Sequence, residues 1–307
     1  MSLLEKMKAA AKGFDGRLGV AVKHLGTGEA ASLNGDEIFP TASVFKVPVI
    51  VELYRQVEGG TVSLDERVVL READKVPGSG ILKELSPGLA LTLRDLVELM
   101  VILSDNTATD LVVEKVGMVN INATIRRLGL EKTGVVADCR DILFDLIGLG
   151  ELADEEKTIG LFNERARSAA REGTWSLGVE ENNVTTPKEM LRLLEMISEG
   201  EAASRESCDA ILETMGRCQT GGYRIPKHLP QGAEVAHKTG SLPGIRNDAG
   251  IVAIPDGGGR YVISCFTKEA ADNYAAEEAV AWVSKEVYDH LAFQSGSAPR
   301  RGSCPAP

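Results

Sequence analysis

The stretch Thr41-Ala-Ser-Val-Phe-Lys-Val47 opens the longest apolar helical pattern of the chain, which runs over Val44–Val57. In a helix, Ser43 and Lys46 lie three residues apart on one face of the first turn. Unpaired N–H groups and the helix dipole favour negative charge at that end. A buried lysine with a lowered pKa can take the proton of a serine, so the pair fits a nucleophile and its base. It also fits an N-cap serine followed by a surface lysine.

Helical patterns fill the chain on the C-terminal side of this stretch, up to about Arg217. Apolar residues recur there at spacings of three and four, and polar capping residues precede them. The pattern predicts four further helices, over Leu93–Leu103, Asn106–Val116, Val119–Leu128 and Pro187–Ser198.

Strand patterns lie at both ends of the chain, outside the helical block. They predict strands over Arg17–His24, Ala30–Leu33, Glu234–Lys238, Ala249–Ile254 and Tyr261–Phe266, with terminal helices over residues 2–13 and Ala275–Phe293. The economical arrangement is an α+β fold, in which one antiparallel sheet is built from both chain ends and flanked by the terminal helices. An all-α domain is then inserted between the two halves of the sheet, and a cleft is expected where the domains meet.

The domain boundaries follow from these patterns. We expect a discontinuous sheet domain over residues 1–41 and 218–295 and an all-α domain over residues 42–217. Residues 296–307 are rich in Ser, Gly, Pro and Arg, a composition that does not form a core, and predict a disordered tail.

The overall charge limits the classes of partner. The chain has 307 residues, with 45 acidic against 34 basic side chains and a formal net charge of −11. This balance argues against nucleic acid and against an anionic membrane surface, and no apolar window reaches the roughly 18 residues of a membrane helix. A small molecule is the expected partner, bound by a monomer. The charged start lacks a signal-peptide pattern and predicts a cytoplasmic location, or an extracytoplasmic one if the start has been trimmed.

Cysteine and histidine usage indicates neither a disulfide framework nor a metal site. The five cysteines form no C-x-x-C pair and fit reduced thiols, and the four histidines are scattered without metal-ligand spacing. No glycine-rich phosphate loop is present. We therefore expect no metal and no cofactor.

Two further short motifs carry polar groups suited to chemistry. Leu103-Ser-Asp-Asn106 joins two predicted helices, where it is either an ordinary cap or a proton relay at Ser104 with an amide ligand at Asn106. His237-Lys-Thr-Gly-Ser241 lies on a predicted strand and would place a cation and two hydroxyls along one edge. A second Lys-Thr-Gly, at 132–134, follows a helix end without a strand pattern and is discounted.

The three motifs S-x-x-K, S-D-N and K-T-G, in this order, resemble those of class A β-lactamases and penicillin-binding proteins. The similarity extends from about Leu18 to about Leu291 and includes Val184-Thr-Thr-Pro-Lys188. The resemblance implies a sheet domain and an all-α domain with the active site between them, which agrees with the cleft expected from the pattern.

The resemblance also implies catalytic roles. Ser43 would be the acylated nucleophile and Lys46 its base or proton shuttle. Ser104 and Lys238 would pass the proton to the leaving nitrogen of the substrate.

The same resemblance implies a set of binding residues. Asn106 would hold the side-chain amide of the substrate, and Thr239 and Ser241 would bind a substrate carboxylate. The backbone N–H groups of Ser43 and Ser241 would form the oxyanion hole. Arg246 either adds charge for the carboxylate or is a cation at the strand edge.

One family motif is missing. Class A enzymes hydrolyse the acyl-enzyme with a glutamate in an E-x-x-L-N motif, which this sequence lacks. Asp138-Cys-Arg-Asp141 is the best local fit, because it places Asp141 near that position, and Glu180 and Glu181 are alternatives. A misplaced base costs orders of magnitude in rate.

Residues 142–178 resemble an insertion relative to compact members of the family. The segment is apolar at first and then basic. It predicts either a helical pair packed on the all-α domain or an apolar lid that reshapes the pocket.

The leading hypothesis is a serine hydrolase that opens a β-lactam, or a related amide or ester, through a Ser43 acyl-enzyme. A penicillin-binding, esterase or D-alanyl peptidase-like enzyme is the first alternative. The second is a module that binds the acyl group without turnover.

Overall fold

A computed structural model describes residues 1–168 and 182–294. Its main layer is an antiparallel sheet with the strand order β2-β1-β9-β8-β7. The strands are β1 (Arg17–His24), β2 (Ala30–Leu33), β7 (Glu234–Leu242), β8 (Ile245–Ile254) and β9 (Gly259–Lys268). The two chain ends meet where β1 pairs with β9, with Val20 opposite Cys265. The predicted α+β class, with one antiparallel sheet built from both ends of the chain, is confirmed.

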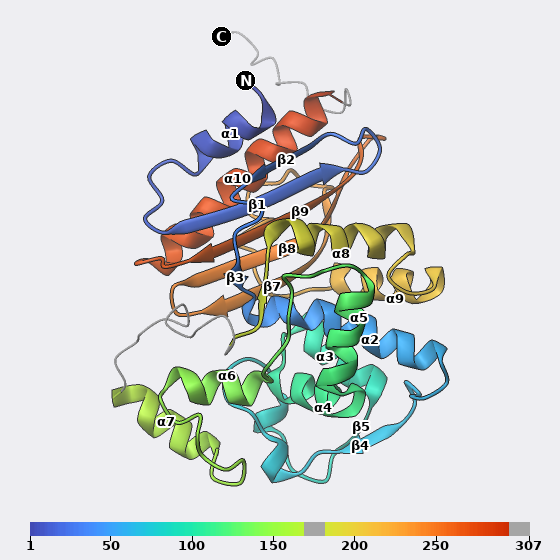
Figure 1. Cartoon of the computed structure of the whole chain (residues 1–307), viewed down its shortest axis with the longest axis vertical. Coiled ribbons are helices and arrows are strands. Elements are labelled where there is room, and N and C mark those ends of the chain that lie inside the picture. The colour runs from blue at the N-terminus through green and yellow to red at the C-terminus, as the bar shows by residue number, and fades with distance from the viewer. Residues whose placement is uncertain (169–181, 295–307) are drawn as a thin grey trace, which may run out of the picture.

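The terminal helices lie together on one face of this sheet. They are α1 (Leu3–Ala10) and α10 (Asn273–Gln294), and Figure 1 shows them side by side above the blue and orange strands. A separate apolar cluster joins them to the sheet, with Met7, Tyr261 and Val283 all fully buried. The sequence placed both helices within a few residues, because their apolar faces are long and regular.

Helices also cover the other face and continue below it. The set comprises α2 (Lys46–Glu58), α3 (Leu93–Ile102), α4 (Asn106–Val116), α5 (Met118–Arg127), α6 (Cys139–Leu146), α7 (Ile159–Ser168), α8 (Pro187–Glu199) and α9 (Arg205–Gly216). Of these, α8 packs on β1 and β9, and α9 packs on β7. The Thr186 hydroxyl accepts from the Glu189 N–H and caps α8, whose first residue is Pro187.

Short elements connect the layers. Two small antiparallel pairs are formed by β3 (Phe39–Pro40) with β6 (Val184–Thr185) and by β4 (Arg67–Val69) with β5 (Ala90–Thr92). Three 3-10 turns lie between β3 and β5 in the chain. They are η1 (Ala42–Phe45), η2 (Glu72–Asp74) and η3 (Leu82–Glu84). The β3–β6 pair matters for the site, because β3 leads directly into η1.

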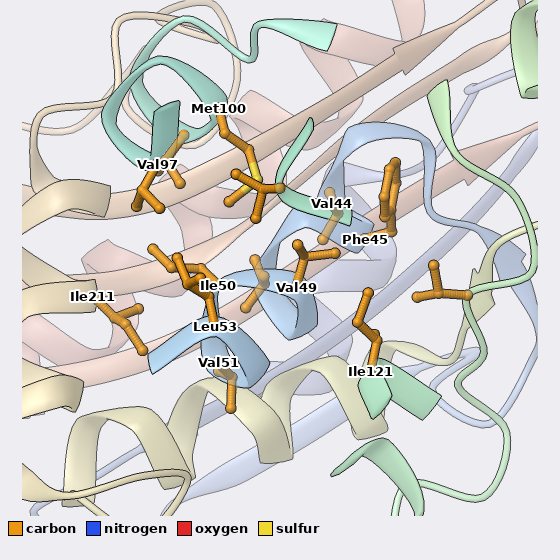
Figure 2. Packing of buried hydrophobic residues seen from close by; sticks show 14 of the residues in the cluster. Val44, Phe45, Val49, Ile50, Val51, Leu53, Val97, Met100, Ile121 and Ile211 are labelled. Atoms are coloured by element: carbon orange, nitrogen blue, oxygen red, sulfur yellow. The ribbon is translucent and has the colours of Figure 1, made fainter. Parts of the chain in front are cut away.

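Helix α2 is the centre of the larger core. Its first nine residues, Lys46 to Tyr54, are all buried, so the helix is enclosed on every side rather than on one stripe. It packs against α4, α5 and α9, and Figure 2 shows Ile50 and Leu53 directed toward Val97 and Ile211. The apolar stretch that follows Ser43 thus fixes the position of that serine against the core.

Part of the proposed insertion is described by the structure. Helices α6 and α7 contact each other through Phe144 and Phe162, whose ring centroids lie 5.8 Å apart. Residues 169–178, like Glu180, Glu181 and the predicted tail, lie outside the described residues. The proposed domain boundaries stay a prediction. Within the described ranges, no helix is long and apolar enough to cross a membrane.

Candidate active site

Ser43 lies in η1, where the edge strand β7 meets the helical layer. The backbone of β7 approaches η1 so closely that a Cβ on Gly240 would lie 2.5 Å from the Thr41 carbonyl oxygen and 3.0 Å from the Ser43 nitrogen. Any larger residue at 240 would push the two segments apart. The glycine of the Lys-Thr-Gly motif is therefore required by packing beside Ser43.

The backbone on both sides of the cleft is held in an uncommon conformation. Ala42, directly before Ser43, has a φ of +43°, and Ser104 has a φ of +56°. Non-glycine residues adopt this left-handed region rarely, and such positions concentrate at functional sites. Both occur in the motifs that the sequence singled out.

Two buried lysines converge on Ser104. The Lys46 Nζ donates to the Ser104 Oγ at 3.1 Å and to the Ser104 carbonyl oxygen at 2.8 Å. From the opposite wall, the Lys238 Nζ lies 3.0 Å from the same Oγ and donates to the Thr239 carbonyl oxygen at 2.9 Å. Neither lysine exposes any surface. The structure thus joins three residues from η1–α2, the α3–α4 loop and β7, all predicted from sequence as one site.

The surroundings favour neutral amines. Burial lowers the pKa of Lys46. Burial, together with the charge of Lys46, lowers the pKa of Lys238 to about 7. Two ammonium groups on one serine hydroxyl repel each other in a low dielectric, so one of them readily loses its proton.

Asn106 closes the third side of this network. Its Oδ1 accepts from the Lys46 Nζ at 3.0 Å, and its Nδ2 donates to the Pro77 carbonyl oxygen at 2.9 Å. Asp105 caps α4 through the Ala108 N–H and also receives the N–H groups of Ile81 and Leu82. The Ser-Asp-Asn motif therefore serves as a helix cap and as part of the polar cluster at once.

A cavity of about 160 Å³ opens beside Ser43. Its wall combines hydroxyl and amide groups with an apolar side from α6. The lining residues are Ala42, Ser43, Phe45, Gly78, Ser79, Asn106, Cys139, Ile142, Leu143, Ser241 and Leu242. No carboxylate is among these described lining residues.

The carboxylates considered for deacylation lie elsewhere or outside the described residues. Asp141 accepts from the Lys157 Nζ at 2.6 Å and does not line the cavity. Asp110, which the sequence did not single out, is half-buried, and its two oxygens accept the N–H groups of Cys139 and Arg140 at 2.8 and 3.0 Å. Burial, with the charge of Asp138, raises the pKa of Asp110 to about 8, so this carboxyl is held largely protonated near neutrality.

The sequence leaves Arg246 open as a cation for the substrate carboxylate or a cation at the strand edge, and a second arginine, Arg224, contacts Ser241. The Arg246 Nη1 donates to the Leu242 and Ile245 carbonyl oxygens, and its Nε lies 3.3 Å from Glu277. Arg224 pairs with the same Glu277 at 3.1 Å, but it also donates from Nη2 to the Ser241 Oγ at 2.6 Å and from Nη1 to the Gly240 carbonyl oxygen at 3.1 Å. Sequence reasoning missed Arg224, because it lies in an irregular segment without a motif.

Thr239 has a hydroxyl partner that was also missed. Its Oγ1 lies 2.6 Å from the Thr220 Oγ1, so the segment after α9 runs along β7 at this point. Thr239 and Ser241 alternate with Lys238 and Gly240 along the strand, as the pleat requires. The motif residues therefore divide between the lysine cluster and the neighbouring hydroxyl row.

This fold, with Lys46 and Lys238 buried against Ser104 at the junction of sheet and helices, defines a serine hydrolase of the β-lactamase type. The chain belongs to the Beta-lactamase enzyme family, whose model matches residues 2–291. It is 29% identical to a β-lactamase of Bacteroides uniformis, covering 95% of this chain and 92% of that protein. It is 27% identical to the extended-spectrum β-lactamase PER-1 of Pseudomonas aeruginosa, covering 93% and 86%.

Solved structures agree with this assignment. The crystal structure of a β-lactamase from Sphaerobacter thermophilus has 32% identity and a TM-score of 0.78, covering 96% of this chain and 99% of that one. The structure of PBP-A has 27% identity and a TM-score of 0.77, covering 95% and 96%. The family suggested by the three motifs is thereby confirmed over nearly the whole chain.

Proposed function

We propose that the protein forms an acyl-enzyme on Ser43 with a β-lactam or a related amide or ester. The observation that carries this proposal is the pair of buried lysines, Lys46 and Lys238, that share the Ser104 hydroxyl beside the cavity. The activated serine of such an enzyme needs a neutral base and a proton path to the leaving group. In this cluster Lys46 would be the neutral base, and Ser104 with Lys238 would be the proton path.

In the proposed step, the Ser43 Oγ attacks the substrate carbonyl carbon. The serine proton moves to the neutral Lys46, and the carbon–nitrogen bond of the substrate breaks as the tetrahedral intermediate collapses. The leaving nitrogen takes a proton that Ser104 relays, with Lys238 on the other side of that hydroxyl. The products of acylation are an ester on Ser43 and a protonated amine.

Backbone and side-chain donors would stabilise and orient the substrate. The N–H groups of Ser43 and Ser241 are proposed as the oxyanion hole, since β7 packs directly on η1 at Gly240. The hydroxyls of Thr239 and Ser241 would bind a substrate carboxylate, with Arg224 as the cation behind Ser241. Asn106 would contact the substrate amide. Arg246 would be a cation at the strand edge and would not bind the substrate carboxylate.

Deacylation is proposed to be slow. Water needs a general base next to the ester, and the described cavity wall offers Cys139, Ile142 and Leu143 at the α6 side instead of a carboxylate. Loss of a positioned base typically costs about 10²–10⁴-fold in rate. This favours a second candidate function, a penicillin-binding type of enzyme that keeps its acyl group. A mutant of PBP-A, 27% identical with a TM-score of 0.74, was solved as an acyl-enzyme complex with penicillin G.

A single assay distinguishes these functions. The protein is mixed with a fluorescent penicillin and with a chromogenic cephalosporin, alongside Ser43→Ala and the cavity-wall control Ser79→Ala. We expect stoichiometric labelling with little turnover in the wild type and in Ser79→Ala, and none in Ser43→Ala. Sustained colour would show efficient deacylation. Full labelling of Ser43→Ala would refute the proposed nucleophile.

Membership of the family indicates a small-molecule substrate of the β-lactam class. A monomeric state and a cytoplasmic location stay predictions. Gel filtration at micromolar concentration checks the first, and fractionation of the producing cell checks the second.

A further inference from the structure

A buried amide on β8 holds the backbone that leads into Ser43. Asn247 is fully buried. Its Nδ2 donates to the carbonyl oxygens of Pro40 and Thr41, at 2.8 and 3.0 Å. Its Oδ1 accepts the Thr267 N–H at 2.9 Å. These three contacts fix the orientation of the amide, because a reversed amide would turn its oxygen toward two carbonyl oxygens and its hydrogens toward an N–H.

The segment that Asn247 holds has a backbone conformation that needs support. Ala42, which lies between Thr41 and Ser43, has a φ of +43°. A residue with a Cβ keeps such a conformation only where its surroundings enforce it. On the far side from Asn247, the Thr41 N–H donates to the Asn183 carbonyl oxygen at 2.8 Å. Thr41 is therefore held through both its N–H and its C=O, directly before the strained residue.

The same amide lies next to the point where β7 approaches this segment. Asn247 is the register partner of Gly240, so the two residues face the same side of the sheet. The space in front of Gly240 is filled by the Thr41 carbonyl oxygen and the Ser43 nitrogen, 2.5 and 3.0 Å from where a Cβ would lie. Asn247 thus bonds the segment before Ser43 to the sheet exactly beside the strand that carries Ser241.

The main chain of Asn247 has a separate contact with the proposed carboxylate-binding cation. The Arg224 Nη1 donates to the Asn247 carbonyl oxygen at 2.8 Å and to the Gly240 carbonyl oxygen at 3.1 Å. A change of the Asn247 side chain leaves this main-chain contact in place. Substrate binding through Arg224 and support of the segment before Ser43 can therefore be separated by experiment.

We propose that Asn247 is a positioning residue for acylation, which sets the N–H of Ser43 against the N–H of Ser241 so that both face the oxyanion of the tetrahedral intermediate. This inference rests on the proposed function, because it concerns the same acylation step. Asn247 is not among the residues that line the cavity, and it acts through Thr41. Oxyanion donors stabilise the transition state more than the bound substrate. Loss of the amide should therefore slow acylation and leave substrate binding nearly unchanged.

Stopped-flow labelling with a fluorescent penicillin at several concentrations separates these two effects. It gives the rate constant of acylation and the dissociation constant of the non-covalent complex. We expect Asn247→Ala to lower the rate constant at least tenfold, and by up to about a hundredfold, since a small misplacement of reacting groups costs that much. The dissociation constant should change less than threefold.

Asn122→Ala is the matched control. The Asn122 Nδ2 donates to the Met118 and Val135 carbonyl oxygens, and its Oδ1 accepts the Val135 N–H. This variant loses the same three kinds of hydrogen bond at a residue that does not line the cavity. Both constants should stay within threefold of the wild type.

Two further readouts distinguish positioning from general damage. Asn247→Asp keeps the acceptor for the Thr267 N–H and, when protonated, one donor, so its rate constant should fall less than that of Asn247→Ala. The pH profile of acylation is set by the lysine cluster, so Asn247→Ala should keep the wild-type midpoint near pH 7. Damage to the whole site would shift that midpoint.

The proposal is overturned if folded Asn247→Ala loses less than tenfold in the rate constant, or if its loss is confined to the dissociation constant. An equally large fall in Asn122→Ala also overturns it. If neither Asn247 variant folds while Asn122→Ala does, the amide is needed for folding, and its specific role in acylation is rejected. If the wild type is never labelled, or Ser43→Ala is labelled equally well, the proposed function itself fails and this inference fails with it.

Discussion

Lys46 and Lys238 contact the same atom, the Ser104 Oγ, at 3.1 and 3.0 Å. The two residues are far apart in sequence and enter from opposite walls of the cleft, and both are fully buried. Burial and mutual repulsion make it costly to protonate both. Such a cluster would keep one proton acceptor next to one donor near neutral pH, which is the condition that the proposed acylation of Ser43 requires.

The pH dependence of acylation tests this cluster. Because Lys46 acts as the neutral base and Lys238 as the proton donor, and the pKa of Lys238 is lowered to about 7, the rate of labelling by a fluorescent penicillin should fall as the pH rises through about 7. Stopped-flow fluorescence at fixed ionic strength measures the profile. A rate that is flat from pH 5 to 9 contradicts the proposed role.

Removing the base should remove the reaction. Lys46→Ala is expected to slow labelling of Ser43 at least a hundredfold, within the range typical of general-base loss. Lys188→Ala is the matched control, since that lysine is half exposed and paired with Asp36. Retention of wild-type labelling in a folded Lys46→Ala protein would exclude Lys46 as the base.

Substitutions of the two arginines near Ser241 are expected to affect the efficiency of acylation differently. Arg224→Ala should lower the efficiency of acylation by a carboxylate-bearing penicillin about tenfold or more, because a hydrogen bond to a charged group contributes about 1.5–3 kcal/mol. Arg246→Ala should change it less than threefold. An ester substrate without a carboxylate is the control, since it should react equally with all three proteins. The reverse ranking would restore Arg246 as the binding cation.

Adding a carboxylate to the cavity should restore turnover. Leu143 lines the α6 wall and is partly exposed, so Leu143→Glu places a base facing the acyl group, and Leu143→Gln is its uncharged match. We expect steady-state hydrolysis of a chromogenic cephalosporin to rise at least tenfold in the glutamate variant only. Equal rates in both variants, or fast turnover in the wild type, would show that deacylation has another base.

The core helix behind Ser43 should dominate stability. Ile50→Ala empties space at the centre of α2 and is expected to lower the free energy of unfolding by about 2–5 kcal/mol. Val119→Ala, on a side chain that is 81% exposed, should change it by less than about 0.5 kcal/mol. Urea denaturation followed by circular dichroism measures both. Equal losses would mean that α2 is not the packing centre.

Most elements could be predicted from local pattern. The periodicity of α4 and the alternation of β1 gave their observed ends, Asn106–Val116 and Arg17–His24. The Lys-Thr-Gly strand was predicted too short, since β7 continues to Leu242 through pairing with β8. The helix at Ser43 begins as the 3-10 turn η1, and α2 starts only at Lys46. Such ends depend on neighbours that a local pattern does not contain.

The sequence by itself determined the α+β class, the family and the residues of the three motifs, because hydrophobic periodicity and short motifs are properties of adjacent residues. Only the tertiary structure decided what those residues contact. The sharing of Ser104 by two lysines, the choice of Arg224 at Ser241, and the apolar α6 wall facing Ser43 all join segments distant in sequence. Contacts of that kind are set by how the core around α2 packs against the sheet, and packing is a property of the whole chain.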